Sequence, residues 1–212
     1  MATVITSLLD TDLYKFTMWQ ALLHSNPGAQ AEYRFVCRNR PEFPLSELKA
    51  DVEREIEQLC SLHFAQDELD YLGSLRFLKS DFVDFLSVFR LQRRFIDVRA
   101  VGEMLEIVAR GPLVHVMSFE IFVLYIVNEL YFRRLPQEGV LDVARGRLED
   151  KLSVLKSALR DTAEASVSPF ALFDFGLRRR YSGAWQEEVV TRLAEEVPAW
   201  RCRRWSTCSP GA

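Results

Sequence analysis

The densest group of side chains able to bind an anion lies in the run FDFGLRRRYSGAW, residues 173–185. An apolar stretch ends there at Gly176, and Arg178, Arg179 and Arg180 follow almost at once. Ligands of α/β proteins bind where strands end, and guanidinium groups offer paired donors that match phosphate and carboxylate oxygens. A glycine at such a point lets a ligand come close to the backbone. The run therefore predicts a site for an anionic ligand.

Two other interpretations of these arginines stay open. They can solvate a loop or pair with acidic neighbours such as Glu187 and Glu188. Together with the arginines of residues 201–204 they could also form a nucleic-acid patch. The chain carries 27 Lys and Arg against 30 Asp and Glu, a formal charge of -3, whereas nucleic-acid binders are usually strongly basic. A nucleic-acid partner is therefore not expected.

A second candidate group surrounds the start of the first predicted helix. Asp10, Thr11 and Asp12 precede Tyr14 and Lys15, so carboxylates that can cap a helix lie beside an aromatic ring. Such a group can orient a metal-bound phosphate or stack a planar ring. Ordinary capping of the helix, with Tyr14 in the core, explains the same residues and stays open as well.

The elements expected to position these residues are of mixed type. The segment DTDLYKFTMWQALLHSN predicts a helix. The segment AEYRFVCRN alternates between two faces and predicts a strand, with Arg38 at its end as a third candidate for anion binding. The runs 95–101 and 104–109, joined through Gly102, predict a β-hairpin.

Apolar residues that recur at helical spacing predict the other helices. One begins near Ser46, and two shorter helices span residues 67–72 and 80–89. A long amphipathic helix follows later, whose expected inner side consists of Leu141, Val143, Leu148, Leu152 and Leu155. A buried strand over residues 168–176 and a last helix over residues 182–197 complete the pattern.

Composition describes a soluble globular protein with no membrane partner. The most apolar run, residues 119–132, contains Glu120, Asn128 and Glu129 and is shorter than the roughly 20 residues of a membrane span, so it predicts a buried core helix. The cysteines show no paired metal-ligand spacing, and the N-terminus has no basic and apolar leader, so a cytoplasmic location is expected. Residues 199–212 lack periodicity and are expected to form an aberrant, disordered tail.

Four segments of the chain resemble, in the family's order, the opening half of the bacterial nicotinate phosphoribosyltransferases. They are SLLDTDLYKFTMWQALL, EYRFVCRN, GPLVHVMSFEIFVLYIVNELYFR and FDFGLRRRYSGAWQEEVV, the last with the family's Asp-Phe-Gly-x-Arg element. The resemblance implies an α/β fold of the type II phosphoribosyltransferase kind. Residues 1–135 would form an α+β part of helices and a small sheet, and residues 136–198 would form helices and the first strand of an incomplete α/β barrel.

The resemblance also implies an activity, the entry step of NAD salvage. In this family nicotinate is joined to phosphoribosyl pyrophosphate with release of pyrophosphate, and ATP hydrolysis drives the formation of nicotinate mononucleotide. Matched motif to motif, Tyr14 and Phe175 would sandwich the pyridine ring, Arg178 would face the substrates and Arg38 would contact phosphate. Family members are homodimers, so Tyr14 and Arg38 would come from across the interface. Mg²⁺ would accompany the pyrophosphate.

The resemblance ends near Pro198, before the segments that carry the family's phosphorylated histidine. His24, His63 and His115 lie outside that motif and are expected to be packed or surface histidines. No catalytic residue and no complete metal site are assigned. A truncated enzyme without turnover of its own is therefore expected, and the alternative is a non-catalytic remnant or dimerisation fragment.

Overall fold

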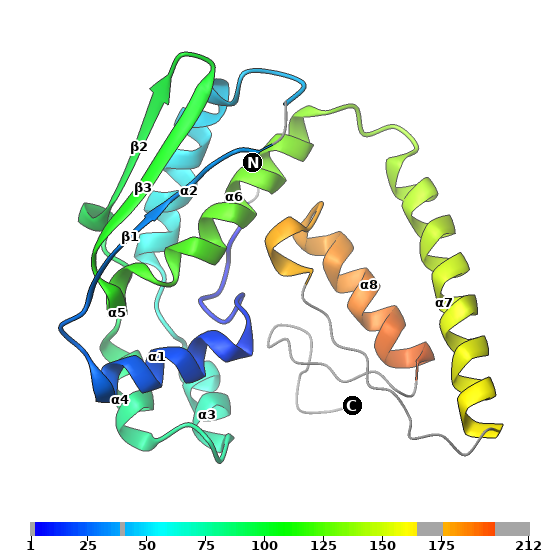
Figure 1. Ribbon diagram of the computed structural model, residues 1–212, viewed down its shortest axis with the longest axis horizontal. Coiled ribbons are helices and arrows are strands. Elements are labelled where there is room, and N and C mark those ends of the chain that lie inside the picture. Colours follow the sequence, from blue (N-terminus) through cyan, green and yellow to red (C-terminus); the bar gives the residue numbers. More distant parts are fainter. Residues whose placement is uncertain (1–2, 39–40, 165–175, 198–212) are drawn as a thin grey trace.

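The described part of the chain combines helices with one small sheet (Figure 1). The computed structural model describes residues 3–38, 41–164 and 176–197. The α-helices are α1 (Leu13–Ser25), α2 (Lys49–Ser61), α3 (Gln66–Ser74), α4 (Ser80–Val88), α5 (Leu113–Val116), α6 (Phe119–Arg134), α7 (Val140–Glu164) and α8 (Gly183–Glu196). The strands are β1 (Gln30–Arg34), β2 (Ile96–Val101) and β3 (Met104–Pro112), and the short 3-10 turns are η1 (Leu45–Leu48), η2 (Arg93–Phe95) and η3 (Leu177–Arg179).

The sheet is antiparallel with the strand order β1-β3-β2, and α2 packs against its buried face (Figure 1). β2 and β3 form the predicted hairpin, which pairs Ile96 with Ala109 and Val101 with Met104. Gly102 closes the turn with φ 59°, a left-handed conformation that glycine adopts without the steric cost of a side chain. The hairpin prediction is confirmed.

The prediction that Arg38 lies at the end of a strand is wrong, because β1 ends at Arg34. The backbone amide of Phe35 still donates to the carbonyl of Ile107 over 2.9 Å. The alternation of burial nevertheless continues to Arg38, whose side chain is exposed. Periodicity reports which face of an extended chain is buried, whereas a strand also needs a partner's amides and carbonyls. The faces were therefore predictable and the end of the strand was not.

α6 is the central helix of the larger core, as its sequence predicts. Nine of its 16 residues are buried, among them Phe119, Phe122 and Tyr125. The stretch Leu113–Arg134 is long and apolar enough to cross a membrane, but most of it is buried inside the structure. That burial is typical of a core helix in a globular protein.

α7 and α8 pack against each other beside this core (Figure 1). Leu148 and Leu152 are buried in their shared cluster, and Leu155 packs against it, as expected. The expectation for Leu141 and Val143 is wrong, since they are 36% and 56% exposed. Both residues lie in the first turn of α7. The buried contact with α8 begins farther along α7, at Leu148, so no described residue buries these two side chains.

The observed architecture is a mixture of helices and a small antiparallel sheet. The predicted helices near residues 13, 46, 67, 80, 119, 140 and 182 are confirmed. The predicted strand of residues 168–176 and the tail of residues 199–212 fall outside the described residues, apart from Gly176.

His115 is a packed histidine, as expected, and its surroundings make stability depend on pH. Its imidazole lies between the rings of Phe89 and Phe95, with centroid distances of 5.4 and 5.5 Å. Its Nδ1 is buried without a hydrogen-bond partner among the described residues. Burial, and next the charge of Arg94, lower the pKa of His115 below its ordinary value. The unfolded chain therefore binds a proton at a higher pH than the folded chain does.

Acidification from pH 7 to pH 5.5 should therefore lower the free energy of unfolding, because the unfolded state gains a proton near the ordinary histidine pKa of about 6.5. In the His115→Phe variant this loss should be smaller. Urea unfolding at both pH values measures it, with His63→Gln at an exposed position as the matched control. An equal loss in wild type and His115→Phe would show that His115 is not the group responsible.

Candidate functional site

Two candidate residues far apart in the sequence meet directly. Arg178 in η3 donates a hydrogen bond from Nη2 to the hydroxyl of Tyr14 in the first turn of α1. The Arg178 carbonyl accepts a hydrogen bond of 2.7 Å from Nδ2 of Asn128, which ties η3 to α6. The contact between Tyr14 and Arg178 lies within one chain, whereas the resemblance implied that Tyr14 would reach the site from across a dimer interface.

Glu120 completes the group that surrounds Arg178. Its Oε1 accepts a hydrogen bond of 3.0 Å from Nη1 of Arg178, and its Oε2 accepts one of 2.6 Å from Nζ of Lys15. Asp12 adds a second carboxylate, with Oδ2 3.9 Å from Nε of Arg178. We call Asp12, Tyr14, Lys15, Glu120 and Arg178 the Arg178 cluster. Its two cations balance its two carboxylates, and the Arg178 side chain is 35% exposed and therefore open to a ligand.

The tyrosines near the cluster stay neutral at physiological pH. Burial raises the pKa of Tyr14 above its ordinary value of 10.0, Arg178 opposes this rise, and the charges of Asp12 and Glu120 add to it. Tyr33 of β1 lies near enough to be affected too, since burial, Glu120 and Tyr14 raise its pKa in that order. Both phenols therefore act as hydroxyl groups with an apolar ring.

Arg180 occupies a different environment from Arg178, although the two are neighbours in the sequence. Its side chain is 1% exposed, with Nη1 3.0 Å from Oδ2 of Asp10 and Nε 3.3 Å from Oε2 of Glu129. Its Nη2 donates to the carbonyl of Val4 over 3.0 Å, and its guanidinium lies 4.3 Å from the centre of the Tyr125 ring. Arg180 therefore joins the N-terminal segment, α6 and the start of α8, and it has a structural role.

The predicted capping role of the N-terminal acidic residues is not what the structure shows. Asp12 is the residue before α1, but its side chain makes no capping hydrogen bond. Asp10 instead pairs with Arg180, and Asp12 lies beside Arg178. A charged guanidinium attracts a carboxylate more strongly than a backbone amide does, so these long-range ion pairs take the place of local capping.

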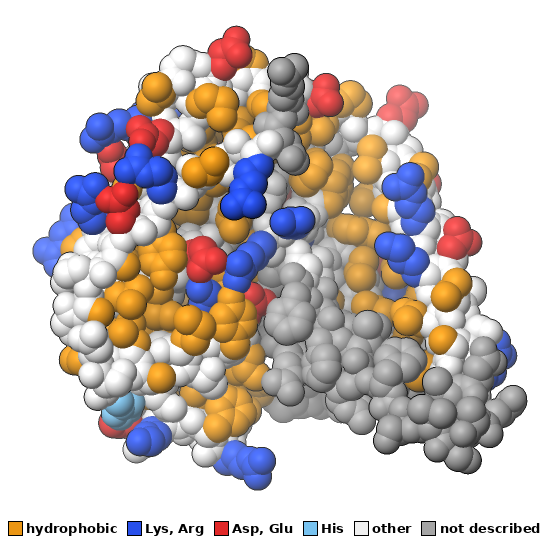
Figure 2. Space-filling view, viewed as in Figure 1, with side chains coloured by type: hydrophobic (Ala, Val, Ile, Leu, Met, Phe, Trp, Pro, Cys, Tyr) orange, Lys and Arg blue, Asp and Glu red, His pale blue; other side chains and the backbone are white. Residues whose placement is uncertain are grey.

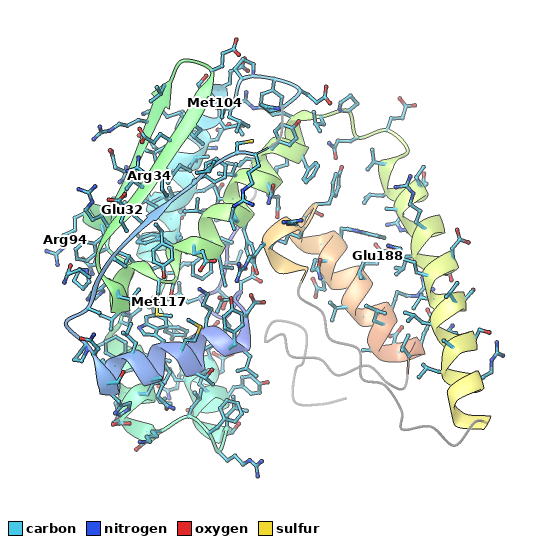
Figure 3. All side chains as sticks on the ribbon, viewed as in Figure 1. Glu32, Arg34, Arg94, Met104, Met117 and Glu188 are labelled. Carbon is cyan, nitrogen blue, oxygen red and sulfur yellow. The ribbon has the colours of Figure 1, made fainter. Side chains whose placement is uncertain are left out.

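Two of the other sequence candidates do not belong to this cluster. Arg179 and Arg38 have exposed side chains, and Phe175 falls outside the described residues. Glu188, one of the acidic neighbours proposed as alternative partners, pairs with another arginine: it points from α8 toward α7 (Figure 3) and accepts a hydrogen bond of 2.7 Å from Nε of Arg145. Of the four predicted substrate-binding residues, the structure thus brings Tyr14 and Arg178 together.

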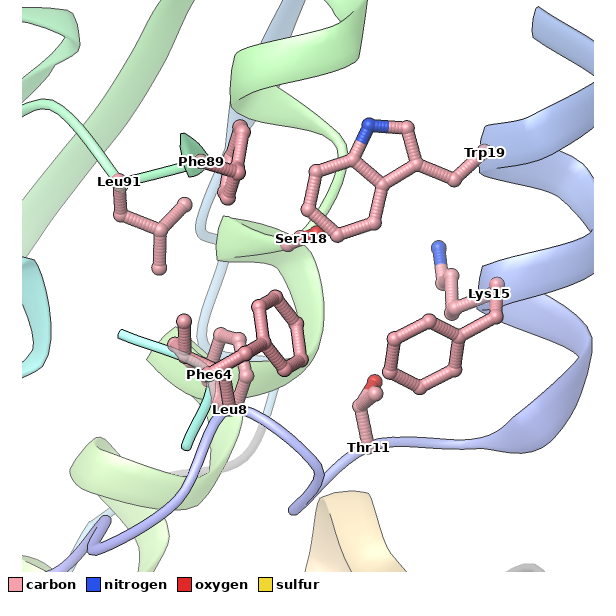
Figure 4. A pocket seen from close by; sticks show the side chains of 10 residues that line it. Leu8, Thr11, Lys15, Trp19, Phe64, Phe89, Leu91 and Ser118 are labelled. Carbon is pink, nitrogen blue, oxygen red and sulfur yellow. The ribbon is translucent and has the colours of Figure 1, made fainter. Parts of the chain in front are cut away.

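A small cavity lies on the inner side of the cluster, where Lys15, Thr11 and Ser118 join mainly aromatic side chains (Figure 4). Its volume is about 10 Å³. That is room for about one water molecule, so the cavity is too small for a pyridine ring.

A larger, open groove of about 450 Å³ lies on the exposed face of the sheet. Its lining includes the arginines Arg34, Arg94, Arg99 and Arg110. Glu32 pairs with Arg34 and Arg110, and basic and acidic side chains mix over this part of the surface (Figure 2). None of the five residues of the Arg178 cluster lines this groove.

Sequence reasoning missed Glu120 and Glu129 as partners of the arginines. Both were read only as interruptions of an apolar run, yet they provide the carboxylates for Arg178 and Arg180. A charged residue inside an otherwise apolar core helix needs a partner, and that requirement was the available signal. Within the described ranges, no three His, Cys, Asp or Glu side chains gather as metal ligands.

Comparison with known proteins places this geometry in a family. Residues 9–128 match the model of the nicotinate phosphoribosyltransferase N-terminal domain. The nicotinate phosphoribosyltransferase of Herminiimonas arsenicoxydans is 62% identical over 200 residues, which is 94% of this chain and 50% of that protein. The one from Neisseria meningitidis serogroup A is 50% identical over 201 residues, again 94% of this chain and 50% of that protein.

Solved structures of nicotinate phosphoribosyltransferases resemble this fold. The crystal structure of nicotinate phosphoribosyltransferase from Vibrio cholerae superposes with a TM-score of 0.82 at 28% identity, covering 97% of this chain and 48% of that one. The Porphyromonas gingivalis structure gives 0.80 at 30% identity, covering 95% and 50%. The chain thus spans about half the length of the relatives it matches. On the match of its residues 9–128, the chain belongs to the nicotinate phosphoribosyltransferase family.

Proposed function

We propose that this chain provides part of the substrate site of a nicotinate phosphoribosyltransferase, which forms nicotinate mononucleotide from nicotinate and phosphoribosyl pyrophosphate. The observation that carries the proposal is the contact between Arg178 and Tyr14. It places an aromatic ring and a partly exposed guanidinium side by side in a member of this family. A planar aromatic acid and a polyphosphate are the two chemical classes that such a pair suits.

The proposed roles follow from these environments. The Tyr14 ring would stack one face of the pyridine. The raised pKa of the Tyr14 hydroxyl would keep this group neutral beside the substrate carboxylate. Arg178 uses two of its five N–H donors for Tyr14 and Glu120, so donors remain for phosphate oxygens. Its positive charge would stabilise the pyrophosphate as negative charge builds up on the leaving group.

Other parts of the proposal come from family membership. Phe175 would stack the second face of the pyridine, and Arg38 would contact phosphate from another subunit of a homodimer. Residues 136–198 would begin an α/β barrel after an N-terminal part of residues 1–135, with residues 199–212 outside both. ATP would be a co-substrate, and the enzyme would act in the cytoplasm.

Magnesium fits this part of the chain poorly as a directly bound ion. The described residues offer no group of three ligands, and Asp12 and Glu120 are engaged with Arg178. Mg²⁺ binds mainly through substrate phosphates and water in many enzymes, with one or two protein carboxylates. We therefore assign no residue here to Mg²⁺.

A chimera tests the proposal, with the 200 aligned residues of this chain replacing those of the Herminiimonas arsenicoxydans relative. Incubated with nicotinate, phosphoribosyl pyrophosphate, Mg²⁺ and ATP, it should form nicotinate mononucleotide, measured by chromatography, at a rate within about tenfold of the relative. A folded chimera without product, beside an active relative, would contradict the proposal. Self-association of the chain without affinity for either substrate would favour a dimerisation fragment instead.

A further inference from the structure

Glu120 is the residue through which the Arg178 cluster is held together. It bridges two cations, with one carboxylate oxygen on Lys15 and the other on Arg178. The Lys15 side chain is 5% exposed, whereas those of Glu120 and Arg178 are 30% and 35% exposed. The bridge therefore runs from a buried anchor to a group that a ligand can reach.

The buried anchor makes the position of Glu120 hard to change. Lys15 lies on α1 among buried residues, and withdrawal of Glu120 would leave its ammonium desolvated without this carboxylate. Such a loss is strongly unfavourable for a buried charge. The Glu120 carboxylate is therefore held in place more firmly than that of an exposed surface ion pair.

Fixing Glu120 also fixes Arg178. The guanidinium is held by Glu120 at Nη1 and by Tyr14 at Nη2, while Asn128 holds its backbone carbonyl. Asp12 lies on the Nε side. A planar group held at several edges has one orientation, and the neutral Tyr14 hydroxyl is oriented by the same contact.

We propose that Glu120 is a positioning residue, which sets Arg178 and Tyr14 in place before a ligand binds. The proposal rests on the proposed function for the identity of that ligand. Pre-orientation removes the entropy cost of ordering a long side chain at the moment of binding.

The test uses NMR of the whole chain with ¹⁵N-labelled arginine, which needs no ligand. In the wild type, slow rotation about the Cζ–Nη bonds of Arg178 should give separate Nη–H signals, assigned by their loss in Arg178→Lys. In Glu120→Gln, rotation should become roughly ten- to a hundredfold faster, because a charged hydrogen bond is lost. Glu120→Asp should act in the same direction, since the shorter side chain cannot reach both cations.

The matched control is Glu106→Gln, which removes a carboxylate 2.7 Å from Arg34 on the exposed face of the sheet. It should leave the Arg178 signals unchanged. If Glu120→Gln and Glu120→Asp lower stability but leave the Arg178 rotation at its wild-type rate, Glu120 is only structural and the proposal is overturned. Titration of the wild type with phosphoribosyl pyrophosphate separates the positioning role of Glu120 from the proposed function. If the variants show faster rotation but the wild type does not bind this substrate, the positioning role is retained and the proposed substrate is rejected.

Discussion

Replacement of Arg180 by alanine should lower the free energy of unfolding by about 3–5 kcal/mol. The guanidinium is 1% exposed and contacts the side chains of Asp10 and Glu129, which are 11% and 6% exposed. Its removal leaves two buried carboxylates close together and takes a donor from the carbonyl of Val4. Glu129 keeps Arg133 and the backbone amide of Gly183 as partners, so the cost comes mainly from the loss of the guanidinium charge between these carboxylates in a site that water reaches poorly.

Equilibrium unfolding in urea measures this loss, and Arg145→Ala is the matched control. Arg145 also pairs with a carboxylate, that of Glu188, but its side chain is 48% exposed. Its replacement should cost much less than that of Arg180, because exposed ion pairs contribute little to stability. Similar small losses in both variants would show that Arg180 does not hold the N-terminal segment to α6.

Replacement of Arg178 by alanine should weaken the binding of phosphoribosyl pyrophosphate by about 1.5–3 kcal/mol, or roughly 10- to 150-fold in Kd. The reason is the loss of charged hydrogen bonds from a guanidinium that is already oriented by Tyr14 and Glu120. Stability should change less than in the Arg180 variant, because the Arg178 side chain is 35% exposed.

The chimera with the Herminiimonas arsenicoxydans relative allows this effect to be measured as a change in kcat/KM and in the KM for phosphoribosyl pyrophosphate. Arg145→Ala again serves as the control, since it removes an arginine from the surface of α7. Unchanged kinetics in a folded Arg178→Ala chimera would remove Arg178 from the substrate site.

Much of the fold could be predicted because its signals are local. The alternation in β2 and β3 and the glycine between them specify the hairpin, and the apolar spacing of α2 specifies an amphipathic helix. The end of β1 and the exposure of Leu141 depend on partners distant in sequence. Local periodicity carries no information on such partners.

The candidate site also has features that the sequence predicts and features that depend on partners distant in the sequence. Tyr14 and Arg178 were predicted through family motifs, and the structure brings them together. The different fates of Arg178 and Arg180 could not be predicted, because three adjacent arginines look alike in a sequence. Their separation is set by two carboxylates of α6, Glu120 and Glu129, which lie about two and a half helical turns apart and reach different guanidinium groups.

The most direct test of the account is to locate where phosphoribosyl pyrophosphate binds on this chain. NMR of the arginine and tyrosine side chains during titration with the Mg²⁺ complex of that substrate gives the answer. If Arg178 and Tyr14 form the substrate site, the signals of both should shift saturably in the wild type, and the Tyr14 signal should stay unshifted in Arg178→Ala. Shifts confined to Arg34, Arg99 and Arg110 on the exposed face of the sheet, with Arg178 and Tyr14 unmoved, would contradict it.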